Sequence, residues 1–192
     1  SPGFERFLQT PAFEATFGGG EANVAVSLAG FGMDAAFVTA LPKNDIAEAC
    51  IRELRGFGVD VHGIARTEGR LGIYFLETGA SMRASNVIYD RSHSAISEAD
   101  LSDFDFDRIF EGADWFHFTG ITPALGDNVA ELTEEGCKIA KEMGLTVSCD
   151  LNYRKKLWTT EKAGKVMGKL MEYVDVVVAN EEDAEKVFGI KA

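Results

Sequence analysis

Short apolar runs alternate with amphipathic stretches through the second half of the chain. The apolar runs have the length and composition of buried strands and lie at 114–118, 145–149 and 174–179. After them, apolar residues recur at helical spacing over 128–143, 160–173 and 181–188. A strand, a helix and a second strand of the same sheet form a parallel crossover unit. The pattern therefore predicts an α/β fold of three layers, with a parallel sheet between two layers of helices.

The first half of the chain shows the same alternation. A strand is expected at 35–41, followed by a helix that Asp45 could cap and by a short strand at 59–64. The apolar stripe expected on that helix consists of Ile46, Ala49, Cys50, Leu54 and Phe57. The stretch 21–29, which follows three glycines, is apolar at most positions and predicts a helix that is buried on most sides.

Residues 66–95 differ from the rest because they show no helical period. They contain two strand-like runs around a turn at 78–81, which predicts a protruding β-hairpin. The alternation of strand side chains places Tyr74 on one face of the first strand, and Tyr89 with Arg91 on one face of the second. This face is typical of a lid over a ligand, although tyrosines there could equally cover apolar surface or a subunit interface.

We therefore divide the chain into two parts. An α/β body is expected from 18–65 and 96–192, and a β lid from 66–95 together with the extended segment 1–17. A hydrophobic content of 46% over 192 residues is sufficient for one domain with a buried core.

Charge and hydropathy exclude several classes of function. The chain has 31 acidic and 19 basic residues, a net charge of -12, and no cluster of lysine and arginine that would follow a phosphate backbone, so nucleic acid is not expected as a partner. No apolar run approaches the roughly 20 residues that cross a membrane, and the first residues do not resemble a secretory signal, so we expect a cytoplasmic protein. Three widely spaced cysteines indicate reduced thiols and no metal site.

Gly18, Gly19 and Gly20 precede the first predicted helix. Glycine allows the backbone to turn tightly and to approach a ligand, and the helix start offers free N–H groups, so an anion or a hydroxyl group could bind there. The alternative is that the glycines only permit tight packing.

Polar residues follow two of the predicted strands, where ligands of open α/β sheets bind. An extended backbone would place Asp150, Asn152 and Arg154 on one side, with a guanidinium group suited to a carboxylate or a phosphate. The residues Asn180 to Asp183 could cap their helix and also hold a hydrated Mg²⁺ ion, although capping alone would explain them.

Other nucleotide and metal motifs are absent from the sequence. The three glycines do not match G-x-G-x-x-G, because Asn23 occupies the sixth position. The segment 164–169 differs from a P-loop in its spacing and lies within a predicted helix. The three histidines are isolated, so neither a zinc hydrolase nor a cysteine nucleophile is indicated.

Taken together, these motifs resemble the ribokinase-like (PfkB) family of carbohydrate kinases. The residues Gly18 to Ala25 resemble the Gly-Gly-x-x-x-Asn signature of that family, and Asn180 to Asp183 resembles its Asn-x-x-Glu element. The segment 150–154, followed by Leu157 and Trp158, is similar to one in 2-keto-3-deoxygluconate kinases. The resemblance extends along nearly the whole chain and includes the β lid.

The resemblance implies roles for particular residues. It implies that Gly19, Gly20 and Asn23 hold the sugar and that Asp150 and Asn152 belong to the same pocket. It further implies that lid residues close over the sugar, that Arg154 reaches the substrate or the phosphate, and that Asn180 and Asp183 help to place Mg²⁺ and phosphates without direct metal ligation. The lid residues concerned are Tyr74, Tyr89 and Arg91. The family has glutamate where Asp183 stands, which weakens the role assigned to that residue.

The resemblance also implies that a longer parent protein is needed for catalysis. The Asp-Thr-x-Gly-Ala-Gly-Asp segment, which supplies the catalytic base in that family, does not occur in this sequence. We therefore expect a ribokinase-like fold truncated at both ends, without the opening strand and without the nucleotide-binding C-terminal half of the family. Such an N-terminal fragment should lack kinase activity alone. The parent is expected to be an ATP-dependent enzyme that phosphorylates 2-keto-3-deoxygluconate or a related sugar acid and forms dimers through its lid. The alternatives are a kinase for fructose, another neutral sugar or a nucleoside, a non-catalytic sugar-binding or dimerisation module, and a dinucleotide-dependent oxidoreductase.

Overall fold

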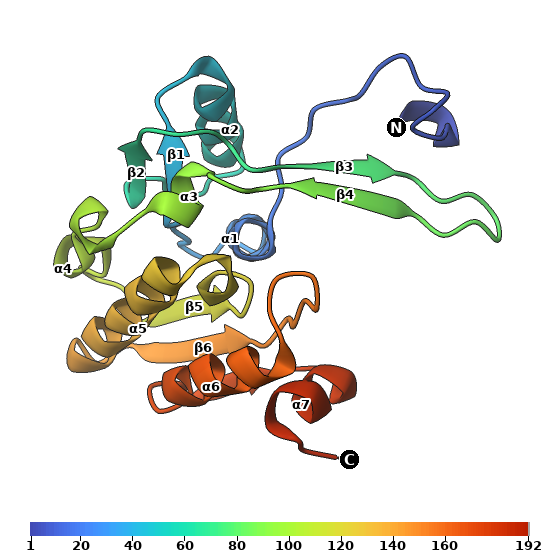
Figure 1. Ribbon diagram of the computed structural model, residues 1–192. Coiled ribbons are helices and arrows are strands. Elements are labelled where there is room, and N and C mark those ends of the chain that lie inside the picture. Colours follow the sequence, from blue (N-terminus) through green and yellow to red (C-terminus); the bar gives the residue numbers. More distant parts are fainter. Residues whose placement is uncertain (192) are drawn as a thin grey trace.

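The computed structural model describes residues 1–191 as an α/β body from which a two-stranded ribbon extends (Figure 1). The strands are β1 Thr39–Pro42, β2 Ile64–Thr67, β3 Ile73–Glu77, β4 Asn86–Asp90, β5 Trp115–Thr119, β6 Thr146–Asp150 and β7 Val176–Val178. The α-helices are α1 Gly20–Gly30, α2 Asp45–Gly56, α3 Ala95–Glu98, α4 Phe106–Ile109, α5 Asp127–Glu142, α6 Thr160–Leu170 and α7 Glu181–Phe188. Short 3-10 helices lie at Pro2–Phe4, Leu101–Asp103 and Pro123–Leu125. No helix within residues 1–191 is long and apolar enough to cross a membrane.

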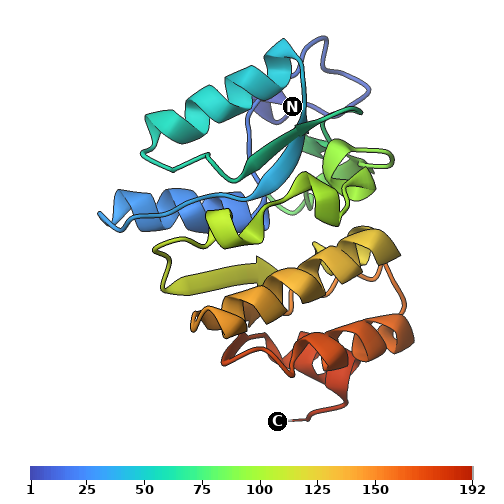
Figure 2. The same cartoon turned by 90° about the vertical axis from the view of Figure 1, so that its left-hand side faces the viewer.

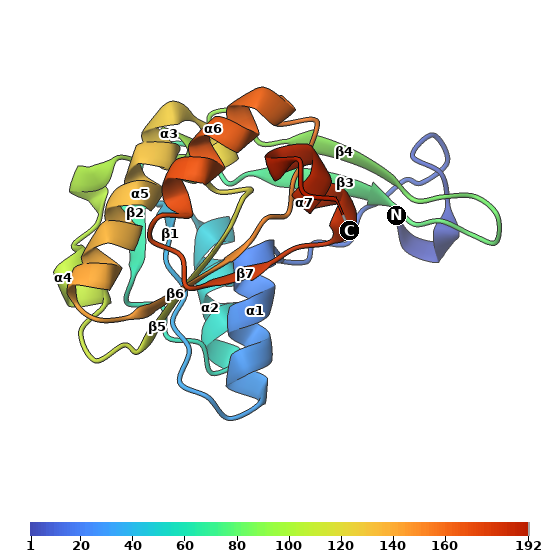
Figure 3. The same cartoon turned by 90° about the horizontal axis from the view of Figure 1, so that it is seen from below.

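The body contains parallel sheets, as the alternation of strands and helices predicts. Strands β5, β6 and β7 pair in parallel in that order, with Phe118 opposite Cys149 and Cys149 opposite Val177. Strands β1 and β2 form a second parallel pair, which residues 1–191 do not connect to the first sheet by strand pairing. Helices α1 and α2 lie on one side of the strands and α5 and α6 on the other (Figure 3). The α/β class is confirmed, and the parallel strands form two sheets in place of one.

The main core lies between the three-stranded sheet and helices α5 and α6. Phe118, Val147 and Cys149 face this core and are almost fully buried, because successive strand residues alternate between the two faces of a sheet. Each helix contributes a stripe at helical spacing. The buried residues of the stripes are Val129, Leu132, Cys137 and Ala140 from α5, and Ala163, Met167 and Leu170 from α6. Figure 2 shows α5 and α6 side by side.

Helix α2 is present, but its buried stripe differs from the predicted one. Asn44, and not Asp45, is the N-cap, and its side chain accepts a hydrogen bond of 3.0 Å from the backbone of Ala47. The buried residues are Ala47, Ile51 and Leu54, whereas Ile46 and Phe57 are exposed. The helix packs against β1 and β2. This packing buries a face of the helix that is shifted by one residue from the face that apolar spacing favoured. The flanking strands also begin later than predicted, and β1 includes Pro42.

Two elements are more exposed than the sequence predicts. Within α1 only Ala25 is buried. The three valines of β7 are 41–56% exposed, because β7 is the outer strand of its sheet and pairs only with β6 among residues 1–191. Apolar composition predicted burial on both faces for these elements, and that prediction is wrong for the described residues.

The predicted hairpin is confirmed as the antiparallel pair β3–β4, with Tyr74 opposite Tyr89. Its chain reversal lies at 80–83, where Ala80 and Arg83 form a β-bridge. The first 17 residues form no strand, but they contact the ribbon. The Phe13 ring lies 5.5 Å from the Phe75 ring, and the Phe7 backbone N–H donates to the Glu77 carboxylate at 2.9 Å.

Candidate functional site

The glycine loop lies where three distant segments meet. A Cβ atom on Gly20 would lie 3.3 Å from the Thr119 methyl group, at the end of β5, and 3.7 Å from the Asn152 amide nitrogen, after β6. A Cβ atom on Gly18 would lie 3.7 Å from both the Tyr74 hydroxyl oxygen and the Asn23 amide oxygen. The loop therefore brings Asn23, Tyr74 and Asn152, from three separate parts of the chain, to one place. Such polar groups can donate to and accept from sugar hydroxyls.

Glu21 holds this loop to the end of β5. Its Oε1 atom accepts hydrogen bonds from the Thr119 backbone N–H at 3.1 Å, the Thr119 hydroxyl at 2.9 Å and the Thr122 hydroxyl at 2.6 Å. Thr119 is almost fully buried. A carboxylate that collects three donors is a strong acceptor, so Glu21 fixes the position of the first turn of α1. The sequence pattern singled out neither Glu21 nor Thr119.

The ends of β5 and β6 approach each other closely at Gly120. A Cβ atom on Gly120 would lie 2.2 Å from the Leu151 carbonyl oxygen, and the Gly120 N–H donates to the Asp150 carbonyl at 2.8 Å. Only glycine fits such an approach. It keeps the segment after β6 next to the glycine loop.

The backbone after β6 bends at Asn152, whose φ angle is +37°. The Asp150 carboxylate accepts from the Asn152 N–H at 3.2 Å and supports this bend. Burial alternates along the segment as predicted, since Leu151 and Tyr153 are buried, but the backbone is not extended throughout. The Arg154 side chain is exposed, and its guanidinium group donates to the Tyr153 carbonyl at 3.2 Å. Among residues 1–191, Arg154 forms no hydrogen bond with the glycine loop.

The ribbon β3–β4 carries Tyr74 and Tyr89 side by side on one face. The centroids of the Tyr74 and Tyr89 rings are 6.2 Å apart, and the Arg91 guanidinium carbon lies 4.2 Å from the centre of the Tyr89 ring. The Lys156 ammonium group approaches the same ring to 5.6 Å. Lys156 belongs to the segment after β6, so the ribbon and that segment meet at Tyr89.

Asn180 and Asp183 cap α7 and bind the segment after β6. The Asn180 amide oxygen accepts from the Asp183 N–H at 2.8 Å. The Asp183 carboxylate accepts from the Asn180 amide at 3.1 Å and from the Tyr153 N–H at 3.2 Å. Both bonds to the Asp183 carboxylate end on the same oxygen, Oδ2. Residues 1–191 contain no group of three or more His, Cys, Asp or Glu side chains arranged to hold a metal ion. The observed contacts of Asn180 and Asp183 are those of a helix cap and of a support for the segment after β6.

His117, Ser148 and Trp115 form a hydrogen-bonded chain across β5 and β6. The Trp115 indole N–H donates to the Ser148 hydroxyl at 2.7 Å, and that hydroxyl lies 2.8 Å from His117 Nδ1. The Ser148 hydroxyl proton is thus free to bond to Nδ1, which favours a neutral imidazole. Burial lowers the pKa of His117, and the carboxylates of Glu21 and Asp150 oppose that shift.

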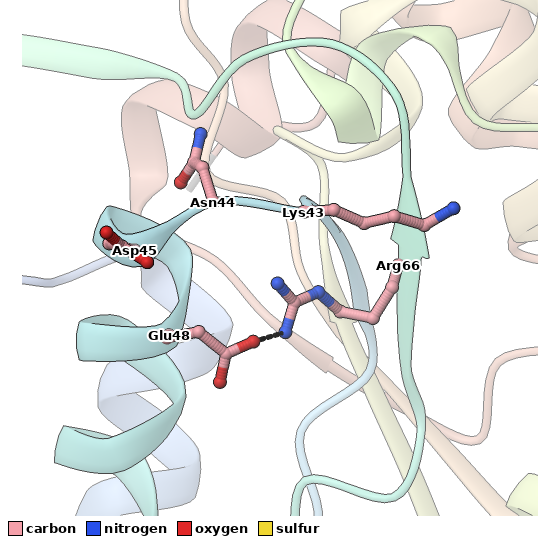
Figure 4. A pocket seen from close by; sticks show the side chains of 5 residues that line it. All are labelled: Lys43, Asn44, Asp45, Glu48 and Arg66. Atoms are coloured by element: carbon pink, nitrogen blue, oxygen red, sulfur yellow. Dashed lines mark hydrogen bonds and ion pairs between the residues drawn. The ribbon is translucent and has the colours of Figure 1, made fainter.

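Two open hollows lie away from the glycine loop, against α2. One has a volume of about 390 Å³ and is shown in Figure 4. It is lined by Lys43, Asn44, Asp45, Glu48 and Arg66. Glu48 and Arg66 are paired across it, and the Arg66 guanidinium also donates to the Pro42 carbonyl at 2.9 Å. The second hollow, of about 430 Å³, lies along the exposed side of the same helix. The residues that line the two hollows all belong to the segment 43–66, so neither hollow includes the glycine loop or the segment after β6.

The cysteines are free thiols, as predicted. Cys137 and Cys149 are buried and Cys50 is half-buried. Burial raises the pKa of Cys137 to about 12 and raises that of Cys149 further, so both remain protonated and unreactive near neutral pH.

Comparison with known proteins identifies relatives along the whole chain. The model of the pfkB family carbohydrate kinases matches residues 4–192. The chain is 38% identical over 189 residues to a 2-dehydro-3-deoxygalactonokinase of Haloferax volcanii, with 98% of this chain and 59% of that protein covered. It is 29% identical to a fructokinase of Oryza sativa, with 95% of this chain and 56% of that protein covered.

Comparison with solved structures also identifies sugar kinases as relatives. The crystal structure of a 2-dehydro-3-deoxygluconokinase from Thermotoga maritima matches with a TM-score of 0.97 and 58% sequence identity, over 99% of this chain and 58% of that one. The described fold is thus that of a known group of sugar kinases. The chain spans somewhat more than half the length of these relatives.

Proposed function

The chain belongs to the pfkB family of carbohydrate kinases, and we propose that it forms the sugar-binding part of an ATP-dependent kinase for 2-keto-3-deoxygluconate or a related sugar acid. The observation that carries the proposal is the meeting of Asn23, Tyr74 and Asn152 at the glycine loop, with Arg91 held nearby over Tyr89. The names of the relatives from Haloferax volcanii and Thermotoga maritima support a deoxy sugar acid as the substrate.

The proposed roles follow from the chemistry of each group. The backbone of Gly19 and Gly20 and the side chains of Asn23, Asp150 and Asn152 bind sugar hydroxyls, and Tyr74 and Tyr89 cover the sugar from above. Arg91 and Arg154 attract the carboxylate, because guanidinium groups form charge-assisted hydrogen bonds with it. In this proposal residues 66–95 and 1–17 act as the lid over the body formed by 18–65 and 96–192.

The reaction proposed for the complete protein is in-line attack of a primary hydroxyl of the sugar acid on the γ-phosphate of ATP. Catalysis of this kind rests on positioning and charge neutralisation. The present residues hold the hydroxyl in place and keep water from it when the lid closes. The catalytic base and the nucleotide site are assigned to residues outside this sequence. Asn180 and Asp183 support the segment after β6, and any part they take in placing Mg²⁺ and phosphate is through that support. ATP as donor is also the reason for proposing a cytoplasmic location.

An assay of ATP-dependent phosphorylation tests the proposal. The gene's complete product should phosphorylate 2-keto-3-deoxygluconate, whereas the 192-residue chain should not. Activity of the 192-residue chain alone would contradict the division of roles. A complete product that binds no sugar acid would contradict the function.

A neutral-sugar kinase is the second candidate, because fructokinases are among the relatives. Rates with the sugar acid, fructose, ribose and a nucleoside distinguish the two. For the sugar acid, Arg91→Ala and Arg154→Ala should each reduce kcat/KM by about tenfold or more, the value of one charge-assisted hydrogen bond. If fructose is phosphorylated faster and neither substitution matters, the protein is a fructokinase. A non-catalytic sugar-binding module is the alternative if the reading frame ends at residue 192.

We also propose a homodimer formed through the lid. Ile73 and Ile88 are each more than 40% exposed on the face of the ribbon opposite to Tyr74, and an isolated two-stranded ribbon is marginal in water. Sedimentation should show a dimer that Ile88→Lys dissociates. A monomeric wild type at high concentration would contradict this.

A further inference from the structure

Two cations approach the ring of Tyr89 from different parts of the chain. Arg91 follows β4 in the lid, and its guanidinium carbon lies 4.2 Å from the ring centre. Lys156 follows β6 in the body, and its ammonium nitrogen lies 5.6 Å from the same centre. A tyrosine face attracts cations, but one ring does not neutralise two of them.

Neither cation has a carboxylate partner among residues 1–191. By contrast, two arginines of the ribbon and its turn are paired: Arg70 with Asp90 at 2.6 Å and Arg83 with Glu77 at 3.3 Å. Within the described chain, Arg91 and Lys156 form no ion pair and no side-chain hydrogen bond. The two cations thus lie against one ring without an ion pair to any carboxylate of the described residues, although the chain has 31 acidic side chains. Such an arrangement favours an anion from outside the chain.

The segment that carries Lys156 is fixed to the body. The Tyr153 N–H donates to Asp183, the Tyr153 hydroxyl donates to the Trp158 carbonyl at 3.2 Å, and the Leu157 N–H donates to the Arg154 carbonyl at 2.8 Å. Tyr153 and Trp158 are buried. Lys156 is therefore presented from a supported loop, which begins at Asn152 beside the glycine loop.

We propose that Lys156 is a specificity-determining residue, which binds the carboxylate of the sugar acid together with Arg91. This inference rests on the proposed function and adds a residue to it. The substrate carboxylate lies between the lid cation and the body cation, so that binding of an acid, but not of a neutral sugar, draws the lid onto the body. Lys156 thus distinguishes substrates by their charge and couples that charge to closure of the lid.

The neighbouring Lys155 provides a matched control. Both lysines are exposed, and the substitutions Lys156→Gln and Lys155→Gln remove the same charge one residue apart, whereas only Lys156 lies against the Tyr89 ring. A third variant, Lys156→Arg, keeps the positive charge at position 156 and serves as the conservative control. Equal melting temperatures of all variants would show that folding is unchanged.

Calorimetric titration of the complete gene product, with 2-keto-3-deoxygluconate and with fructose, tests the inference without requiring turnover. Lys156→Gln should weaken binding of the acid by about fivefold, the upper end for an exposed ion pair, and leave fructose binding unchanged. Lys155→Gln should match the wild type for both sugars, and Lys156→Arg should restore most of the affinity for the acid.

The outcomes separate this inference from the proposed function. If the wild type binds and phosphorylates the acid but the two Gln variants behave alike, the role of Lys156 is overturned and the function stands. If Lys156→Gln weakens binding of the acid and of fructose equally, Lys156 only holds the lid and does not distinguish charge, which also overturns the inference. If the wild type does not bind the acid, both the role of Lys156 and the proposed function are overturned.

Discussion

The Glu21 carboxylate accepts two hydrogen bonds from Thr119, one from its backbone N–H at 3.1 Å and one from its hydroxyl at 2.9 Å. Ninety-eight positions separate the two residues in the sequence. The pair joins the first turn of α1 to the end of β5, and Gly20 packs against the methyl group of the same threonine. The position of the glycine loop therefore depends on this contact.

Replacing Glu21 tests that dependence. Glu21→Ala should lower the free energy of unfolding by about 1–3 kcal/mol, because it leaves a buried N–H and a buried hydroxyl without an acceptor. Glu21→Gln retains an amide oxygen at the same place and should cost less. Urea unfolding of both variants provides the measurement. Equal stability of Glu21→Ala and the wild type would show that the contact does not hold the loop.

Two glycines should respond to alanine in opposite directions. Gly120→Ala should destabilise the fold by about 1–3 kcal/mol or more, because the new methyl group would lie 2.2 Å from the Leu151 carbonyl oxygen. Gly168→Ala, in the exposed part of α6 with no atom within 4 Å of the new group, should stabilise it by about 0.5–1 kcal/mol. Thermal unfolding measures both. A neutral Gly120→Ala would mean that the ends of β5 and β6 can separate freely.

Substitutions at Asn180, the N-cap of α7, distinguish a capping role of this residue from a role in metal binding. Asn180→Ala should cost about 0.5–2 kcal/mol through the lost bond to the Asp183 N–H, and Asn180→Ser, which keeps an N-cap oxygen without placing a second carboxylate beside Asp183, should cost less. Unfolding is measured with and without Mg²⁺. The loss should be the same in both conditions. A loss seen only with Mg²⁺ would instead assign the residue to the metal.

The lowered pKa of His117 predicts how stability changes with pH. The pKa in the unfolded chain is the ordinary value of 6.5, above that in the folded protein. As the pH falls through that value, the unfolded state takes up the proton first, so stability is present at higher pH and is lost on acidification. Between about pH 7 and about pH 5.5, the wild type should lose more stability than His117→Gln, which can still accept from Ser148. The free energy of unfolding is measured by urea unfolding at each pH. If it changes with pH equally in the wild type and in His117→Gln, the assignment of this pH dependence to His117 is wrong.

The pattern of apolar residues predicted the class of the fold and most of its elements. Helix α7 has the predicted bounds, and the two predicted strands of the hairpin are present. These features follow from local periodicity, since a period of two or of 3.6 residues depends on neighbours in the sequence alone. The exposure of β7 and the buried stripe of α2 could not be predicted in this way, because they depend on which surfaces pack against these elements.

For the candidate site, too, some features follow from the sequence and others only from tertiary packing. The sequence by itself determined which residue types are available: glycines before a helix, polar residues after strands, tyrosines and an arginine in a hairpin. Only the tertiary structure decided that Glu21 meets Thr119, that Gly120 lies against Leu151, and that Lys156 reaches Tyr89. Contacts between residues so far apart in the chain are set by the packing of β5, β6 and the lid, and no local pattern encodes that packing.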